Sequence, residues 1–196
     1  MKQPTSGNQA DSKRPTGLIL CGGRGSRAGG IDKGLRQTDG QLAVSRAACL
    51  LQPLCQDILI SANRNVGDYS MLELGTVVTD LRDDFRGPLA GLEAAITRTG
   101  NDLLLVLPCD MPRLLPTVPE QLSKALNADT ALDVVYAKTA DSRHFLCAAM
   151  RTRCGDTISA CLDEGCNAVR LCYARLNVSE LLFEGELAEG FENLNA

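Results

Sequence analysis

Short apolar runs that alternate with helical patterns are the feature that most limits the fold of this chain. Several of these runs are rich in Val, Ile or Leu, as expected of strands buried on both faces of a parallel sheet. Strands that alternate with helices form β-α-β units around such a sheet. The runs that we expect to be strands are Gly17 to Cys21, Asp57 to Ser61, Gly75 to Thr79, Leu103 to Leu107 and Asp133 to Ala137.

Helical spacing of apolar residues marks the segments between these runs. The leucines from Leu42 to Leu54 form one apolar face, Leu89 to Thr99 forms another, and Pro119 to Ala128 begins with a proline suited to a first helical turn. Later we expect a strand, a short helix and a strand, over Phe145 to Met150, Asp156 to Glu164 and Val169 to Leu176. The predicted fold class is α/β, with three layers and a mostly parallel central sheet.

Length and composition indicate one globular domain. A chain of 196 residues is long enough for one core and short for two, so we assign residues 17–196 to a single domain and the polar residues 1–16 to a disordered tail. The net charge of -4 argues against a nucleic-acid binder, which needs a basic surface. No apolar run approaches the roughly 20 residues of a membrane helix, and the tail lacks a signal core. We expect a cytoplasmic protein.

The nine cysteines do not suggest a disulfide framework. Their number is odd, their spacing is irregular, and several lie inside apolar runs. Because no CxxC pair occurs, a zinc site is not indicated either. We expect reduced, mostly buried thiols.

A segment rich in glycine and cationic residues follows the first apolar run. Glycines let the backbone approach a ligand closely, and their N–H groups form an anion-binding concavity. In open α/β sheets, ligands bind at the carboxyl ends of the strands, where this segment begins. It therefore predicts a site for a di- or triphosphate, formed from Gly22, Gly23, Arg24, Gly25, Ser26, Arg27, Gly29, Gly30 and Lys33.

Two familiar phosphate motifs fit this segment poorly. A P-loop requires Gly-Lys-Ser/Thr, whereas the chain has Asp32-Lys33-Gly34. Gly23, Gly25 and Ala28 match the dinucleotide fingerprint GxGxxG/A. That fold, however, needs an acidic residue at the end of the next strand, and the chain has "SANR" there.

Carboxylates follow the third and fourth runs. Asp80 comes directly after one, and Asp110 lies in "PCDMP" after the other. Mg²⁺ prefers one or two carboxylates together with substrate phosphates, so Asp110 suits a magnesium ligand. Alternatively, Asp110 is a turn residue or helix cap, and Asp80 belongs to a solvated acidic loop with Asp83 and Asp84.

A further glycine pair lies in "RGPLAGLEAA", residues 86–95. Pro88 fixes the first turn of the helix expected there, and helix N-termini bind anions. Gly87 and Gly91 then belong either to an anion site or, in the case of Gly91, to close packing of the helix on the sheet.

Together these segments resemble the molybdenum cofactor guanylyltransferases (MobA family), nucleotidyltransferases with a GT-A-like Rossmann fold. "LILCGGRGSRAGGIDKGL" is similar to the family loop L-x-G-G-x-x-x-R-M-G-G-x-D-K-G-L. "SANR", "GPLAGL", "PCDMP" and the terminal "FENLN" resemble further family blocks in the same order. The resemblance covers nearly the whole chain after the tail.

The resemblance implies roles for individual residues. It implies nucleotide contacts for Leu20, Cys21, Gly22, Gly23, Lys33, Ser61, Asp80 and Asp110, with Asp110 as the Mg²⁺ ligand. It implies that Arg27, Lys33 and Asp110 serve catalysis. On the pterin side it implies Gly30, Gly87, Gly91, Asn193 and Asn195, with Arg170 as a substitute for a basic residue that the family has after "DEG". In a frayed C-terminus, the two asparagines would have no role.

Three positions depart from the family pattern. Ala28 replaces a methionine beside the family's arginine, and a smaller side chain leaves the backbone geometry intact. His144 is followed by Phe145 where the family often has proline. Asn167 and Ala168 stand where the family's basic residue is expected.

The implied reaction is transfer of GMP from GTP to molybdenum-molybdopterin, with release of pyrophosphate and with Mg²⁺ as cofactor. Molybdopterin-synthesis proteins and apo-molybdoenzymes would be partners of a monomer, with the nucleotide bound by its N-terminal part and the pterin by its C-terminal part. The alternatives are a cytidylyltransferase, a sugar-phosphate nucleotidyltransferase and a non-catalytic carrier of the cofactor. A carrier would not need Lys33 and Asp110 together.

Overall fold

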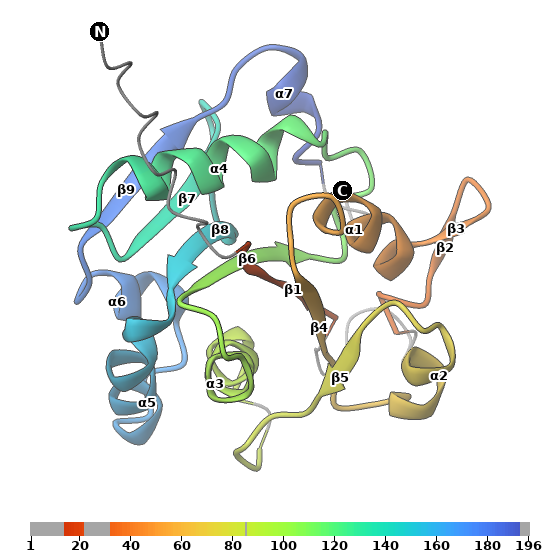
Figure 1. The fold of residues 1–196 in the computed structure, drawn as a ribbon, viewed down its shortest axis with the longest axis horizontal. Coiled ribbons are helices and arrows are strands. Elements are labelled where there is room, and N and C mark those ends of the chain that lie inside the picture. The colour runs from red at the N-terminus through yellow and green to blue at the C-terminus, as the bar shows by residue number, and fades with distance from the viewer. Residues whose placement is uncertain (1–13, 22–31, 85, 193–196) are drawn as a thin grey trace, which may run out of the picture.

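A seven-stranded sheet forms the centre of the molecule (Figure 1). The computed structural model describes residues 14–21, 32–84 and 86–192. Across the sheet the order is β5 (Thr76–Val78), β4 (Asp57–Ser61), β1 (Thr16–Leu20), β6 (Leu103–Pro108), β8 (Arg143–Arg151), β7 (Val134–Lys138) and β9 (Val178–Leu182). Strand β8 pairs antiparallel with both of its neighbours, and every other pair in this sheet is parallel. The prediction of a mostly parallel sheet is confirmed.

Helices cover both faces of the sheet and complete the three predicted layers. One face carries α1 (Ala43–Leu51), α2 (Val66–Met71) and α4 (Thr117–Ala128). The other carries α3 (Pro88–Arg98), α5 (Gly155–Asp163) and α6 (Val169–Tyr173). The remaining elements are a hairpin of β2 (Gln37–Thr38) and β3 (Gln41–Leu42), a 3-10 turn (Thr152–Cys154) and α7 (Glu186–Glu189).

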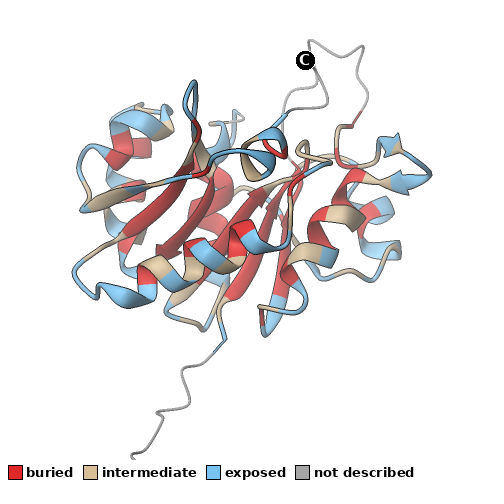
Figure 2. Cartoon of the chain, turned by 90° about the horizontal axis from the view of Figure 1, so that it is seen from above, coloured by how far each residue is buried: buried red, intermediate tan, exposed pale blue. Residues whose placement is uncertain are grey.

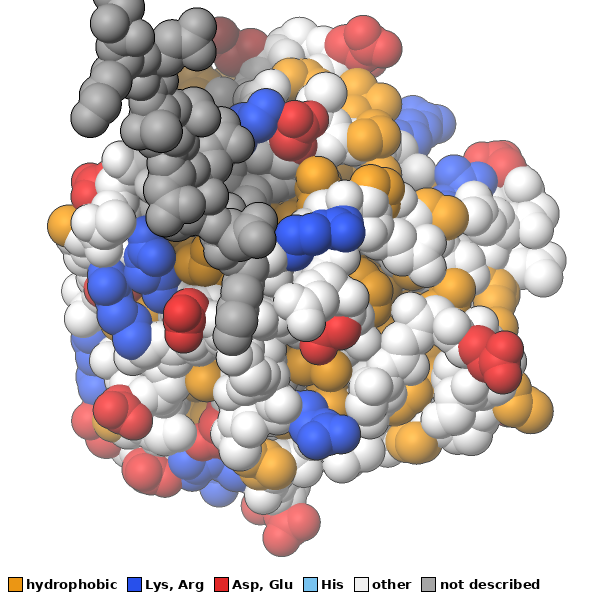
Figure 3. Space-filling model, viewed as in Figure 1, with side chains coloured by type: hydrophobic (Ala, Val, Ile, Leu, Met, Phe, Trp, Pro, Cys, Tyr) orange, Lys and Arg blue, Asp and Glu red, His pale blue; other side chains and the backbone are white. Residues whose placement is uncertain are grey.

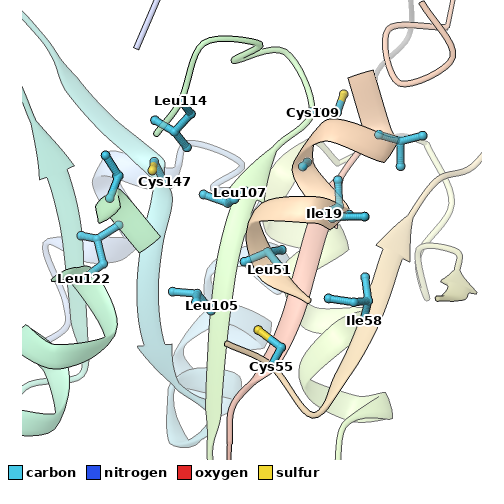
Figure 4. Packing of buried hydrophobic residues seen from close by; sticks show 14 of the residues in the cluster. Ile19, Leu51, Cys55, Ile58, Leu105, Leu107, Cys109, Leu114, Leu122 and Cys147 are labelled. Carbon is cyan, nitrogen blue, oxygen red and sulfur yellow. The ribbon is translucent and has the colours of Figure 1, made fainter. Parts of the chain in front are cut away.

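The strands are apolar at successive positions because both of their faces are covered. Ile19 packs into the cluster beneath α1 and α4, its neighbour Leu18 packs into the cluster beneath α3, and both side chains are fully buried. Figure 2 shows buried residues along the central strands and on the inner sides of the helices. In Figure 4, Leu51 of α1 and Leu122 of α4 lie over the face formed by Leu105, Leu107 and other strand residues. Removal of this apolar surface from water is the main favourable term in folding.

The elements differ from the prediction in several places. The interpretation of Val169 to Leu176 as a strand is wrong, since Val169–Tyr173 is helical. Val169, Cys172, Tyr173 and Leu176 follow helical spacing, and Cys172 and Tyr173 are buried. The hairpin, α2, β9 and α7 were not predicted. Strand β1 begins at Thr16, one residue before the expected run.

Among the described residues, charged side chains of both signs are mixed with uncharged ones on the face of the molecule drawn in Figure 3. Every helix within the described ranges is too short or too polar to cross a membrane. All nine cysteines are free thiols; Cys49 is exposed, Cys166 is partly buried, and the other seven are buried.

Candidate active site

The carboxyl ends of four neighbouring parallel strands meet at one edge of the sheet. Hydrogen bonds continue past the last paired residues: Cys21 N–H donates to Ser61 O at 3.0 Å and Cys109 N–H to Leu20 O at 3.2 Å. Ala62 N–H donates to a carbonyl of β5 at 3.0 Å. The loops that follow β1, β4, β5 and β6 therefore start from one fixed row of backbone, which is where an open α/β sheet binds its ligands.

Lys33 and Asp110 meet at this edge. The Lys33 ammonium lies 3.1 Å from Asp110 Oδ2, although 77 residues separate the two positions. The Lys33 side chain is 43% exposed and the Asp110 side chain 18%. A partly exposed pair of this kind contributes at most about 1 kcal/mol to folding. Its significance is geometric, because it brings a cation and a carboxylate together beside the strand ends.

Asp110 fits a magnesium ligand of the kind that shares the ion with a substrate. It is a carboxylate with partial access to solvent, in the turn directly after β6. Among the described residues, no group of three or more His, Cys, Asp or Glu side chains is arranged to hold a metal ion. A single carboxylate completed by phosphate oxygens and water is the usual protein contribution to a Mg²⁺ site in nucleotide enzymes.

Asn63 fixes Asp80 in place by a reciprocal pair of hydrogen bonds. Asn63 Nδ2 donates to Asp80 Oδ2 at 2.7 Å, and Asp80 N–H donates to Asn63 Oδ1 at 2.8 Å. Burial raises the pKa of Asp80, the Asn63 donor opposes that rise, and the charge of Glu93 adds to it. The loop after β4 thereby positions the carboxylate that follows β5.

A buried carboxylate anchors the next part of the Asp80 loop. Arg82 donates to both oxygens of Glu93, at 2.8 and 2.7 Å, and to Asp163 at 2.5 Å. Ser159 Oγ donates to Glu93 Oε1 at 2.7 Å. The hydrogen bond from Arg82 is the main cause that lowers the pKa of Glu93. The loop is thus tied to α3 and α5.

Gly91 allows α3 to pack closely on the sheet. A Cβ at this position would lie 2.5 Å from Ser61 Oγ and 3.0 Å from Leu20 Cδ2. Ser61 itself is only 3% exposed, with its side chain under the helix. Of the two interpretations of Gly91, close packing is the one that these contacts support. Gly87, by contrast, is exposed and has φ of +77°, a conformation that favours glycine.

A buried polar cluster beside Lys33 was not predicted. The Asp32 carboxylate is 8% exposed and accepts hydrogen bonds from Gly34 N–H, Asn65 Nδ2 and Tyr69 OH. Asn63, Arg82 and Glu93 were missed as well. Asp32 had one local signal, its place directly before Lys33. Asn65 and Tyr69 had none, because they lie at the start of α2 and within it, a short helix with little apolar periodicity.

The structure gives the positions of three other predicted residues, Arg170, Leu20 and Cys21, and the remaining ones lie outside the described ranges. Arg170 is exposed in the last turn of α6, and the loop before this helix reaches Gly87, where a Cβ would lie 3.9 Å from Asn167 O. Leu20 and Cys21 lie at the end of β1 and directly after it. The residues outside the described ranges are Gly22, Gly23, Arg24, Gly25, Ser26, Arg27, Ala28, Gly29, Gly30, Asn193 and Asn195.

Comparison with known proteins agrees with the motifs and the fold. The family model for the MobA-like NTP transferase domain matches residues 17–177. A "Molybdenum cofactor guanylyltransferase" from Burkholderia ambifaria is 39% identical over 191 residues, which cover 92% of this chain and 91% of that protein. A protein of the same name from Shewanella putrefaciens is 34% identical over 179 residues, covering 91% of this chain and 90% of that protein.

Solved structures share the architecture at low sequence identity. A "Molybdopterin-guanine dinucleotide biosynthesis protein A" from Archaeoglobus fulgidus superposes with a TM-score of 0.73 at 21% identity, covering 92% of each chain. A CMP:2-keto-3-deoxy-manno-octonic acid synthetase, solved with CTP, gives a TM-score of 0.70 at 14% identity, covering 88% of this chain and 91% of that one. These similarities establish the nucleotidyltransferase fold and leave the choice of nucleotide to other observations.

Proposed function

The chain belongs to the MobA-like NTP transferase family, and we propose that it transfers GMP from GTP to molybdenum-molybdopterin. The observation that carries this proposal is the meeting of Lys33 and Asp110 at the carboxyl ends of β1 and β6. The names of relatives at 34–39% identity over nine-tenths of the chain support the choice of substrates. Pyrophosphate and the guanine dinucleotide form of the cofactor are the products.

The reaction needs positioning and charge neutralisation more than a strong base. A terminal phosphate oxygen of the pterin, already anionic at neutral pH, attacks the α-phosphorus of GTP. The bond from that phosphorus to the bridging oxygen breaks, and the electron pair leaves with pyrophosphate. An enzyme accelerates such a step by holding both anions in line and by offsetting their charge.

The residues at the strand ends would bind the nucleotide and neutralise its charge. Lys33, with Arg27 from the glycine-rich segment, neutralises the phosphates of GTP and the leaving pyrophosphate. Asp110 would hold Mg²⁺, which when bound neutralises charge at the phosphate under attack. Asp80, fixed by Asn63, would contact the nucleoside. The main chain at Leu20, Cys21, Gly22 and Gly23, together with Ser61, would line the nucleotide.

The pterin would bind on the α3 and α6 side of the same edge. Gly87 and the loop before α6 lie close to each other there, and Arg170 follows on α6. Gly30, Gly91, Asn193 and Asn195 complete the set that the resemblance assigns to the pterin. The single domain would thus bind the nucleotide with its N-terminal part and the pterin with its C-terminal part.

A cytidylyltransferase is the second candidate, favoured by one observation. The fold is shared with a synthetase solved with CTP, so the same strand ends are compatible with a cytosine nucleotide. Thermal unfolding with GTP, CTP, ATP and UTP, each with and without Mg²⁺, distinguishes the candidates, because a ligand of the native state raises its stability. We expect stabilisation by GTP with Mg²⁺. Stabilisation by CTP alone would assign the chain to the cytidylyl reaction.

Two variants make this measurement specific to the site. Lys33→Ala should abolish the stabilisation by GTP with Mg²⁺, while Lys124→Ala should preserve it. Lys124 is an exposed lysine of α4 that pairs with Glu120 on its own helix. A chain that responds to no nucleotide would point instead to a cofactor carrier.

A further inference from the structure

The Asp32 carboxylate is buried beside Lys33 without a cationic partner in the described ranges. It is 8% exposed and is stabilised by three donors, Gly34 N–H at 3.1 Å, Asn65 Nδ2 at 3.1 Å and Tyr69 OH at 2.5 Å. Burial of a carboxylate costs free energy that hydrogen bonds only partly offset. Stability alone therefore does not account for an aspartate at this position.

The hydrogen bond from Gly34 places Lys33 inside a closed turn. An aspartate that accepts the N–H of the residue two positions later forms an Asx-turn, which fixes the backbone of the residue between them. That residue is Lys33. A second hydrogen bond, from Arg36 N–H to Lys33 O at 3.3 Å, continues the turn. The direction in which the lysine side chain leaves the backbone is thereby set by the orientation of the Asp32 carboxylate.

Helix α2 in turn fixes the carboxylate of Asp32. Asn65 directly precedes the helix as its N-cap, and Tyr69 N–H in the first turn donates to Asn65 O at 3.1 Å, which keeps the two residues together. Asn65 has φ of +51°, a left-handed conformation that asparagine tolerates better than most residues. Its amide and the Tyr69 hydroxyl then reach Asp32 together.

Gly34 makes room for the Tyr69 hydroxyl. A Cβ at Gly34 would lie 2.2 Å from Tyr69 Oη and 3.0 Å from Cys21 Sγ. Tyr69 is fully buried, so its hydroxyl cannot turn toward solvent. Because burial raises the pKa of Tyr69, with Cys21 and Asp32 adding to the effect, the hydroxyl stays protonated and acts as a donor. Cys21 and Asp32, the residues on either side of segment 22–31, thus meet beside one tyrosine.

We propose that Asp32, held by Tyr69 and Asn65, is a positioning residue that aims Lys33 at Asp110 and at the nucleotide phosphates. The inference rests on the proposed function, because Lys33 has its task there. It adds α2, a helix whose residues carry no assigned role, to the determinants of nucleotide affinity. Because Tyr69 is fully buried, it would affect the nucleotide through Lys33 and not through direct contact.

A double-mutant cycle tests this dependence. The affinity for GTP with Mg²⁺ is measured by calorimetry for Tyr69→Phe, Lys33→Ala and the double variant. Phenylalanine keeps the buried ring and removes the hydroxyl that donates to Asp32, so we expect affinity to fall about tenfold. In the Lys33→Ala background, the same change should have no further effect, because the lysine that the carboxylate positions is gone.

Two additional variants keep the result interpretable. Tyr136→Phe is the matched control, since the hydroxyl of Tyr136 on β7 also donates to a carboxylate, that of Glu180 on β9, at 2.7 Å. It should bind GTP like the parent chain. Asn65→Gly removes the second donor while tolerating the left-handed backbone, and it should weaken binding less than Tyr69→Phe but with the same dependence on Lys33. It replaces Tyr69→Phe in the cycle if that variant does not fold.

The outcomes separate this inference from the function on which it rests. An equal loss of affinity from Tyr69→Phe with and without Lys33 would mean that the tyrosine acts only through general structure, and would overturn the inference. Unchanged affinity in Tyr69→Phe, when Lys33→Ala weakens binding, would overturn it and leave the proposed function standing. Unchanged affinity in Lys33→Ala would refute the assignment of Lys33 itself.

Discussion

The loops at the carboxyl ends of β1, β4, β5 and β6 contain buried polar contacts that the region of β7, β8 and β9 lacks among the described residues. Beside the loops two carboxylates are buried, Asp32 and, on α3, Glu93. In the second region Glu180 pairs with Lys138, Arg143 and the Tyr136 hydroxyl near the surface, and Arg153 pairs with Asp133. Exposed pairs contribute little, whereas buried polar groups are costly and fix their surroundings. The buried contacts of Asp32 and Glu93 therefore position the candidate site, whereas the pairs of Glu180 and Asp133 join neighbouring strands.

The largest effect is expected on turnover, when Asp110 in the loop after β6 is replaced. Asp110→Asn keeps the size of the side chain and removes its charge, so turnover should fall by about 100-fold or more, as for loss of a charge-stabilising group. Stability should change by less than about 1 kcal/mol, because the pair with Lys33 is partly exposed. Steady-state kinetics and urea unfolding measure the two effects.

Asp129→Asn is the matched control for that variant. Asp129 follows α4, is exposed, and accepts a hydrogen bond from Ala131 N–H that asparagine can also accept. Its turnover should equal that of the parent chain. Full activity in Asp110→Asn would refute the role of Asp110 in the reaction, because its negative charge would then not be needed for turnover.

The pair of Arg82 with the buried Glu93 should contribute more to folding than the exposed ion pairs do. Glu93→Gln leaves Arg82 without its charged partner on α3, and the free energy of unfolding should fall by about 2 kcal/mol, below the ~3–5 kcal/mol of a fully buried pair because Arg82 is partly exposed. Since the pair lowers the pKa of Glu93, the difference from the parent chain is present above the unfolded pKa and disappears as pH falls through the folded one.

Chemical unfolding at several pH values measures this effect, with Glu120→Gln as the control. Glu120 forms an exposed pair with Lys124 on one helix turn, which contributes only about 0.3–0.5 kcal/mol. Equal losses of unfolding free energy in Glu93→Gln and Glu120→Gln would show that burial of Glu93 does not make its ion pair more stabilising.

Close packing between α3 and the strands can be tested at Gly91. Gly91→Ala places a Cβ 2.5 Å from Ser61 Oγ, and overpacking of this kind costs about 1–3 kcal/mol, partly offset by about 1 kcal/mol of helix propensity. We expect a net loss of about 1 kcal/mol in urea unfolding, part of which Ser61→Ala in the same chain restores. Gly67→Ala in α2, where a Cβ meets nothing within 4 Å, should not destabilise. A Gly91→Ala chain of unchanged stability would point back to an anion site at this helix.

The sequence predicts the parts of this molecule that depend on local pattern. Apolar runs gave the central strands, and the rule that carboxyl ends of parallel strands meet predicted that Lys33 and Asp110 serve one site. The prediction of a strand over Val169 to Leu176 is wrong because apolar content alone does not distinguish a strand from a helix, whereas the spacing of these apolar residues is helical. The short hairpin and α2 carry too few apolar residues to show a period.

The supporting contacts depend on packing that local pattern does not reveal. Tyr69 reaches Asp32 across 37 residues because α2 packs beside β5 and brings Tyr69 next to Cys21, and Glu93 binds Arg82 because α3 also lies beside β5. An isolated aspartate or tyrosine in the sequence has many ordinary explanations. Only the three-dimensional arrangement shows that these side chains surround the residues predicted to act on the nucleotide.

The smallest effect is expected at the sheet edge. Hydrogen bonds from Lys138, Tyr136 and Arg143 lower the pKa of Glu180 to about 2. A carboxyl group whose pKa is lowered by folding stabilises the native state above its unfolded pKa, and this contribution is lost as pH falls toward 2. Glu180→Gln should therefore be slightly less stable than the parent chain at neutral pH, equal to it in acid, and unchanged in turnover. Thermal unfolding between pH 2 and 7 with parallel activity assays would measure this, and a loss of turnover would extend the functional region to the far edge of the sheet.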